Sequence, residues 1–143
     1  MCGGGCCPDP VFAPDPQSFL ASTSACGNWC YPCGSTFRTL WEKENSFTGK
    51  VSGTVTINYQ GGCDNLLGVV VYDSQNKPYD NVSGASFVVP KAVGKCLTDT
   101  TGNTVSRAFP DISRVEIVCN SLSETSTNCF GKYCLDLHYT VTV

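Results

Sequence analysis

Cysteine is the residue type in this sequence with the most chemistry available to it, since the chain of 143 residues contains 11 cysteines. They lie in an N-terminal group, in a second dense group and singly beyond it: Cys2, Cys6, Cys7, Cys26, Cys30, Cys33, Cys63, Cys96, Cys119, Cys129 and Cys134. A chain of this length buries about two-thirds of its unfolded surface and does not need disulfides to fold. The odd count means that at least one thiol is free or bonded to another chain.

The first sixteen residues have the composition of a connector rather than of a folded domain. Cys2, Cys6 and Cys7 flank a run of three glycines, and four prolines follow within residues 8–16. Proline fixes φ and removes a donor, so this part is predicted to be extended and semi-stiff. Sixteen extended residues reach about 50 Å, whereas a compact domain of the remaining length has a radius of gyration of about 14 Å. We therefore predict a flexible connector over residues 1–16 that reaches a neighbouring molecule, and one domain over residues 17–143.

The charge and hydropathy of the chain exclude several classes of partner. The net charge is −3, the isoelectric point is near 4.9 and no basic cluster occurs, which argues against nucleic acid and anionic membranes. The longest apolar run, Leu66 to Tyr72, is too short to span a bilayer. No basic and apolar leader precedes Cys2, so no signal peptide is predicted. Without a signal peptide the chain is expected to stay in the cytosol, where cysteines remain reduced. Release by lysis of the producing cell would expose these cysteines to oxidising surroundings, which would explain a cysteine-rich composition.

Short alternating segments after the second cysteine group predict an all-β fold. The predicted strands cover residues 37–41, 50–59, 66–72, 87–89, 104–109, 115–119 and 133–143. Val51, Val55, Ile57 and Tyr59 share one apolar face of the second of these. Residues 122–131 are rich in Ser, Thr and Asn and are predicted to form a loop. No segment has a helical apolar period, so we predict a jelly-roll β-sandwich of about eight antiparallel strands.

The last predicted strand alternates between an apolar and a polar face. Leu135 and Leu137 belong to the inward set, and Cys134, Asp136 and His138 belong to the outward set. A cysteine on the polar face of a regular strand is better placed for another chain than for its own core. By the same parity, Cys119 is predicted to face inward.

Few residues suit catalysis. The single histidine, His138, lies on the outward face without a positioned partner. No carboxylate pair and no glycine-rich phosphate loop is evident. The sequence therefore predicts a protein that is not an enzyme and that requires no cofactor.

Three other interpretations remain open for the cysteines and aromatic residues. Cys26, Cys30 and Cys33, with the thiols of Cys6 and Cys7, could supply ligands to a zinc ion. Alternatively, five internal disulfides and one spare thiol would make a stapled monomer. A secreted, disulfide-rich β-sandwich could also bind a ligand or glycan on a platform drawn from Trp29, Tyr31, Trp41 and Tyr59, although core packing is the expected use of most of these residues.

The chain resembles the subunits of Ena-type (S-type) bacterial endospore appendages, which are disulfide-cross-linked spore pili. The matching features are Cys6-Cys7-Pro8 with Val11-Phe12 in the connector, and a cysteine-containing segment before Gly34-Ser35-Thr36. The terminal run from Gly131 to Tyr139 fits the family's G-x2-C-x4-Y pattern, with Cys134 at the cysteine position. The resemblance covers essentially the whole chain.

This resemblance implies a jelly-roll subunit that associates by sheet augmentation and is locked by its connector. By position, Cys6 and Cys7 are the connector thiols, Cys134 is one acceptor, and Cys26 or Cys30 in the first strand is the other, with spacing favouring Cys26. The implied assembly is an open filament of identical subunits, with related appendage subunits as further partners. The implied location is the endospore surface, after synthesis in the mother cell and oxidation on release.

Overall fold

The computed structural model describes residues 2–3, 5–6, 18–34, 36–44, 49–63, 66–80, 84–91, 103–119 and 128–142, and within them the regular structure is β-strand. The strands are β1 (Cys2–Gly3), β2 (Gly5–Cys6), β3 (Ser18–Pro32), β4 (Phe37–Glu42), β5 (Val51–Gly61), β6 (Leu66–Tyr72), β7 (Phe87–Pro90), β8 (Thr104–Phe109), β9 (Arg114–Val118) and β10 (Asn128–Thr142). No helix among these residues is long and apolar enough to cross a membrane.

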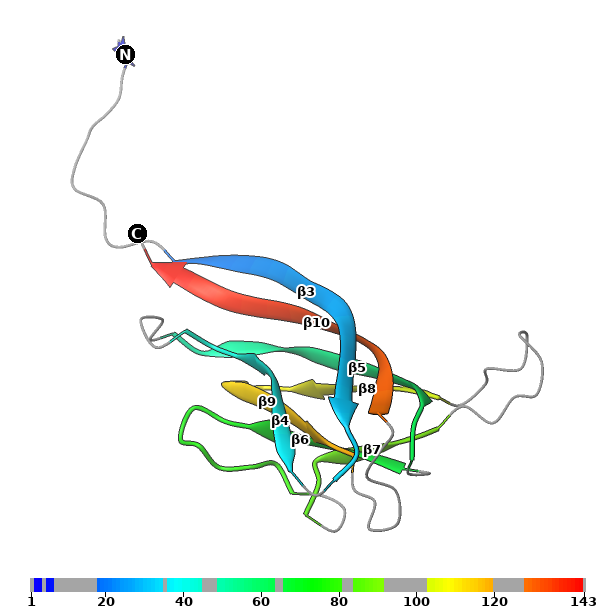
Figure 1. Ribbon diagram of the computed structural model, residues 1–143. Helices are drawn as coiled ribbons and strands as arrows, with labels where there is room; N and C mark the ends of the chain where they lie inside the picture. Colours follow the sequence, from blue (N-terminus) through cyan, green and yellow to red (C-terminus); the bar gives the residue numbers. More distant parts are fainter. Residues whose placement is uncertain are drawn as a thin grey trace.

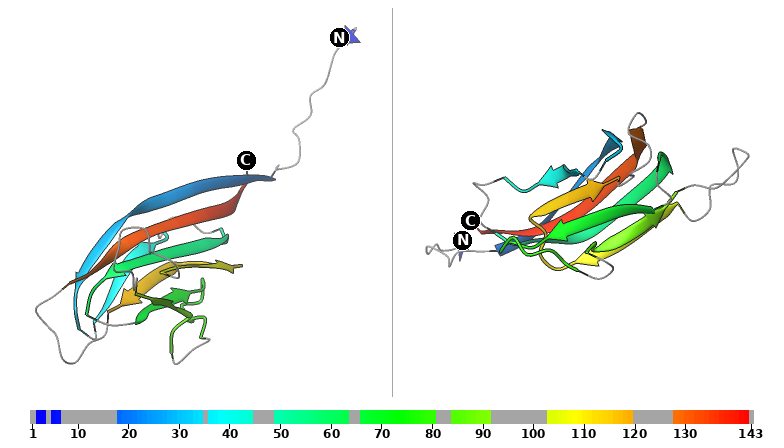
Figure 2. Two further views of the ribbon diagram at one scale, coloured as in Figure 1. Left: turned by 90° about the vertical axis from the view of Figure 1, so that its right-hand side faces the viewer. Right: turned by 60° about the horizontal axis from the view of Figure 1, so that its bottom comes forward.

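Two four-stranded antiparallel sheets form the body of the molecule (Figure 1). One sheet has the order β3-β10-β5-β8 and the other has the order β4-β9-β6-β7, while β1 and β2 make a separate short parallel pair. The two sheets lie as layers over one another (Figure 2). The all-β prediction is confirmed, and the strand order is compatible with the predicted jelly roll.

The core lies between the two sheets and follows the predicted alternation. On β5, Val51, Val55, Ile57 and Tyr59 are buried, and the residues between them are half-buried. On β10, Leu135 and Leu137 are buried, whereas Asp136, His138 and Thr140 are exposed. Side chains of β6, β7 and β9 complete the same cluster from the facing sheet. Burial of these aliphatic side chains is the main source of stability of such a sandwich.

The first strand of the body, β3, was not among the strands predicted from local pattern, and the last strand, β10, is longer than predicted. β10 begins at Asn128 rather than at Tyr133, so residues 128–131 belong to a strand and not to the predicted loop. The reason is tertiary: β10 pairs with β3 along its whole length, from Asn128 opposite Pro32 to Thr142 opposite Ser18. The pairing holds both segments extended over 15 residues each.

The predicted domain boundary falls mostly on residues that the structure does not describe. Of residues 1–16, only 2–3 and 5–6 are described, and β3 begins at Ser18. The connector and the domain boundary therefore stay predictions. β7, which ends at Pro90, is an outer strand of its sheet, where a residue that cannot donate a backbone hydrogen bond is tolerated.

Candidate functional site

A disulfide between Cys26 and Cys134 lies on the outer face of the first sheet. Cys26 of β3 and Cys134 of β10 are register partners, and their Cα atoms are 4.1 Å apart. Cys26 is exposed and Cys134 is half-buried. The outward orientation of Cys134 follows the predicted parity, because its neighbour Leu135 is fully buried. Sequence parity did not find its partner within the chain, since it did not establish which residue of β3 stands opposite.

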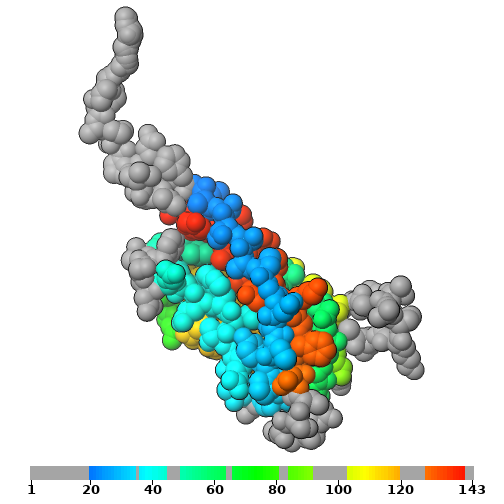
Figure 3. Space-filling view, turned by 45° about the horizontal axis from the view of Figure 1, so that its top comes forward, coloured from blue at the N-terminus to red at the C-terminus, as the bar shows by residue number. Residues whose placement is uncertain are grey.

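An open hollow of about 410 Å³ surrounds this disulfide. Its lining comes from β3, β5 and β10: Cys26, Gly27, Asn28, Thr56, Asn58, Lys132, Tyr133 and Cys134. Two lining side chains of β5 are hydrogen-bonded to β8: Thr56 with Ser106 at 2.7 Å, and Asn58, which donates to Thr104 at 3.0 Å. Figure 3 shows β3 and β10 side by side along this face. The sulfur atoms are therefore presented on a wide surface that another segment of chain could approach.

The other predicted cross-linking residues lie apart from this disulfide or outside the described residues. Cys30 is exposed further along β3, opposite Phe130, and its thiol is free. The backbone of Cys6 belongs to β2, and Cys7 lies outside the described residues. The structure brings Cys26 together with Cys134 and leaves Cys30 separate.

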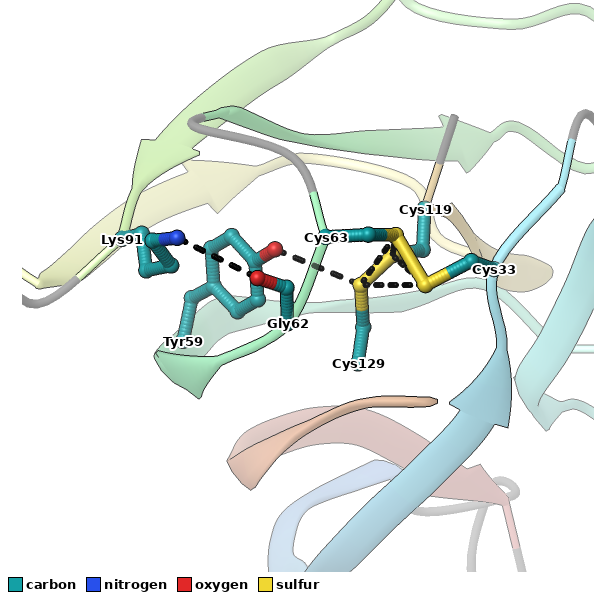
Figure 4. Close-up of a disulfide and its surroundings, with 7 residues drawn as sticks. All are labelled: Cys33, Tyr59, Gly62, Cys63, Lys91, Cys119 and Cys129. Carbon is teal, nitrogen blue, oxygen red and sulfur yellow. Dashed lines mark hydrogen bonds between the residues drawn. A yellow bond between two sulfur atoms is a disulfide. The ribbon is translucent and has the colours of Figure 1, made fainter. Parts of the chain in front are cut away.

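A second sulfur cluster lies at one end of the sandwich and was not predicted as a group. Cys33 is bonded to Cys63, and Cys119 is bonded to Cys129. All four sulfur atoms lie within 4.8 Å of one another (Figure 4). Cys119 is buried, as predicted from its parity, and so are Cys33 and Cys129, while Cys63 is half-buried. The available signal was that each of the four stands just outside or at the end of a strand.

The alternative of a zinc site at Cys26, Cys30 and Cys33 does not agree with the structure. Cys26 is bonded to Cys134, the Cys30 thiol is free, and Cys33 belongs to the buried cluster. Cys26 and Cys30 lie on the outer face of β3, because even-numbered residues of that strand are exposed, whereas Cys33 comes after the strand and is buried. Close spacing along an extended strand therefore separates these thiols instead of gathering them.

The structure confirms core packing, and not a stacking platform, for Trp29 and Tyr59. Trp29 and Tyr59 are 3% and 0% exposed, and their ring centroids are 6.0 Å apart in the core. The indole N–H of Trp29 donates to the carbonyl oxygen of Lys132 at 3.2 Å. Tyr31 and Trp41 are half-buried against the same cluster. Core packing accounts for these aromatic residues.

Comparisons with known proteins agree with this architecture. The family model described as endospore appendages matches residues 4–141. A solved structure of Bacillus endospore appendages, described as disulfide-linked pili, aligns with a TM-score of 0.59 and 15% identity, covering 94% of this chain and 99% of that one. No curated protein matches. Since the family model spans nearly the whole sequence, the predicted resemblance is confirmed and the chain belongs to the endospore appendage family.

Proposed function

We propose that this chain is a structural subunit of a disulfide-cross-linked filament on the endospore surface. The observation that carries the proposal is the Cys26–Cys134 pair, which stands on an exposed face of a chain of the appendage family. A protein with this role acts by assembly and needs no catalytic site. Synthesis in the mother cell would keep the thiols reduced until release, because cytosolic thiols are kept reduced.

Edge strands supply the first contact between subunits. Among the described strands, β3 pairs only with β10, so a 15-residue edge is available for pairing with a neighbour. Leu20 on β3 is 78% exposed and would be covered by such a contact. A long, open edge is an aggregation hazard in a monomer but a template for sheet augmentation in an assembly. Head-to-tail contacts that do not close produce an open filament of identical subunits.

The connector then makes the assembly covalent. A thiolate of Cys6 or Cys7 from one subunit attacks a sulfur of the Cys26–Cys134 disulfide of another, and the released cysteine leaves as a thiolate. This exchange involves no net oxidation, because the disulfide within one subunit is replaced by one disulfide between two subunits. The remaining connector thiol and the released thiol form a second one by losing two electrons and two protons to an oxidant such as molecular oxygen.

The chemistry of the hollow suits this exchange. Cys26 is the more exposed of the two cysteines, so an arriving thiolate has access to its sulfur. Lys132 lines the same hollow and carries a positive charge that favours an approaching thiolate. Cys30 is a poorer acceptor in this arrangement, because it is not paired with Cys134.

Removal of the connector thiols tests the proposal. The double variant Cys6→Ser/Cys7→Ser should fold and associate, but its fibres should dissociate to monomers when boiled in detergent without reductant. The unmodified fibres and the matched control Cys30→Ser should stay in the gel well until reductant is added. Negative-stain micrographs report assembly independently. Double-variant fibres as resistant as the unmodified ones would refute the covalent connector, and absence of filaments from the unmodified chain would refute the filament.

A further inference from the structure

The buried group of Cys33, Cys63, Cys119 and Cys129 has the arrangement of a four-thiolate metal site. The four sulfur–sulfur distances that are not disulfide bonds are 3.4, 3.7, 3.9 and 4.0 Å. Four thiolates around one zinc ion, each at about 2.3 Å, form a tetrahedron whose edges are about 3.8 Å. The spacing between the two disulfides is therefore already that of a tetrahedral mononuclear site.

The backbone also allows the two sulfur atoms of each disulfide to reach this tetrahedral separation. The Cα atoms are 6.4 Å apart for Cys33 and Cys63, and 6.2 Å apart for Cys119 and Cys129. Once both bonds are reduced, rotation about the Cα–Cβ bonds lets each pair of sulfur atoms separate to the remaining tetrahedral edges. An iron–sulfur cluster places iron and sulfide between its cysteines and requires wider spacing.

The surroundings also suit a metal–thiolate centre. The Tyr59 hydroxyl lies 3.3 Å from the Cys129 sulfur and can donate to a thiolate there (Figure 4). The backbone at Gly62 passes so close that a Cβ on it would overlap the Cys129 sulfur, so this position accommodates the cluster only as glycine. Lys91 donates to the Gly62 carbonyl at 3.2 Å and so holds the backbone that leads into Cys63 (Figure 4).

We propose that the reduced chain binds one tetrahedral divalent ion of the zinc class through Cys33, Cys63, Cys119 and Cys129. A purely thiolate tetrahedral set favours zinc among the common divalent ions. Cys33, Cys63 and Cys119 lie just after the ends of β3, β5 and β9, and Cys129 lies at the start of β10. The ion therefore connects strands of both sheets before any disulfide exists. Metal binding of this kind contributes directly to folding stability.

Oxidation exchanges the metal for the two disulfides. Four thiolates that become two disulfides lose four electrons, and one molecule of oxygen accepts these with four protons to give two water molecules. The zinc ion leaves because a disulfide sulfur is no longer an anionic ligand. The same four side chains thus fasten the end of the sandwich in both redox states.

X-ray absorption of the zinc-loaded chain, prepared anaerobically with reductant, tests the proposal. One zinc per chain with four sulfur ligands at about 2.3 Å is the expected result. Nitrogen or oxygen ligands, or no stoichiometric zinc, would overturn it. A variant that keeps the four cluster cysteines and has serine at every other cysteine position should give the same spectrum.

Cobalt titration assigns the ligands in solution. Tetrahedral Co²⁺–thiolate bands should appear in the unmodified chain and in Cys30→Ser with equal affinity. In Cys63→Ser the affinity should fall at least about tenfold, since changes even beyond the ligands cost that much. Cys63 is half-buried, so serine is tolerated sterically. If Cys63→Ser binds cobalt as tightly as the control, or if the variant that retains only the four cluster cysteines binds none, the assignment is wrong.

Discussion

Cys26 and Cys134 stand directly opposite each other on β3 and β10, with Cα atoms 4.1 Å apart and on the face of the sheet that points away from the core. Neither side chain belongs to the hydrophobic core between the sheets. The disulfide contributes a covalent bond between two strands that already pair over 15 residues. This position is the basis for proposing the disulfide as the place of exchange with an incoming thiol.

Replacement of both acceptor sulfurs should separate assembly from cross-linking. The double variant Cys26→Ser/Cys134→Ser should retain the sandwich and form fibres that fall apart in hot detergent without reductant. Circular dichroism checks the fold, and gel electrophoresis checks the cross-links. Cys30→Ser is the matched control, because it removes an exposed thiol from the same face of β3. Full resistance in the double variant would show that the acceptors lie elsewhere.

Truncation in the core should be costly irrespective of the cysteines. Leu135 is fully buried on β10, between the two sheets. Leu135→Ala should lower the free energy of unfolding by about 2–5 kcal/mol, because it removes buried methyl groups and leaves a cavity. Chemical denaturation of the unassembled chain measures this, with Leu20→Ala as the exposed control. Equal losses in both variants would contradict the assigned core.

A methyl group at Gly53 should disturb the pairing of β5 with β10. A Cβ added there would overlap the backbone carbonyl oxygen of Asp136, which cannot move without shifting the strand. Gly53→Ala should therefore cost about 1–3 kcal/mol of unfolding free energy. Ser52→Ala changes the neighbouring half-buried position and serves as control. A neutral Gly53→Ala variant would mean that the two backbones are further apart than described.

The free energy of unfolding should decrease in acid, in part because the carboxylate of Asp111 becomes protonated. Burial disfavours its carboxylate. Hydrogen bonds from the hydroxyl and backbone N–H of Ser74, at 2.6 and 3.1 Å, together with the positive charges of Lys50 and Lys43, outweigh this and lower the pKa of Asp111 below its usual value. An unfolded Asp titrates near 3.9. The contribution of Asp111 to the free energy of unfolding is therefore complete above that pH. It is lost as the pH falls through the pKa of Asp111 in the folded chain, which is the lower of the two.

Asp111→Asn tests that dependence. At pH 7 the variant should be less stable by on the order of 1 kcal/mol, since the site is partly screened by solvent. The difference from the unmodified chain should shrink below about pH 4. Thermal unfolding at several pH values measures it. A difference that is constant down to pH 2 would contradict the role assigned to the carboxylate.

Local patterns predicted the strands that have one buried face, and tertiary pairing decided the rest. The alternation around Val55 and Leu135 predicted β5 and the second half of β10, because a half-buried strand has a period of two. Residues 128–131 of β10 were predicted as the end of a loop rich in Ser, Thr and Asn, yet they are extended because β3 pairs with them. The sequence does not contain that register in any local signal.

The same distinction applies to the cysteines. Parity alone predicted that Cys134 points outward and that Cys119 points inward. Which sulfur bonds to which depends on contacts between distant segments: Cys26 and Cys134 are 108 residues apart, and Cys33 and Cys63 are 30 residues apart. Pairings between positions this distant cannot be deduced from spacing.

Isotope-mixed filaments test the central claim most directly. Subunits grown in ¹⁴N and ¹⁵N media would be mixed while reduced, assembled in air, digested without reductant and analysed by mass spectrometry. The account predicts mixed-isotope disulfide peptides that join Cys6 or Cys7 to Cys26 or Cys134. Cys33, Cys63, Cys119 and Cys129 should be joined only within one isotope. Connector cysteines found exclusively in same-isotope pairs would contradict intersubunit cross-linking.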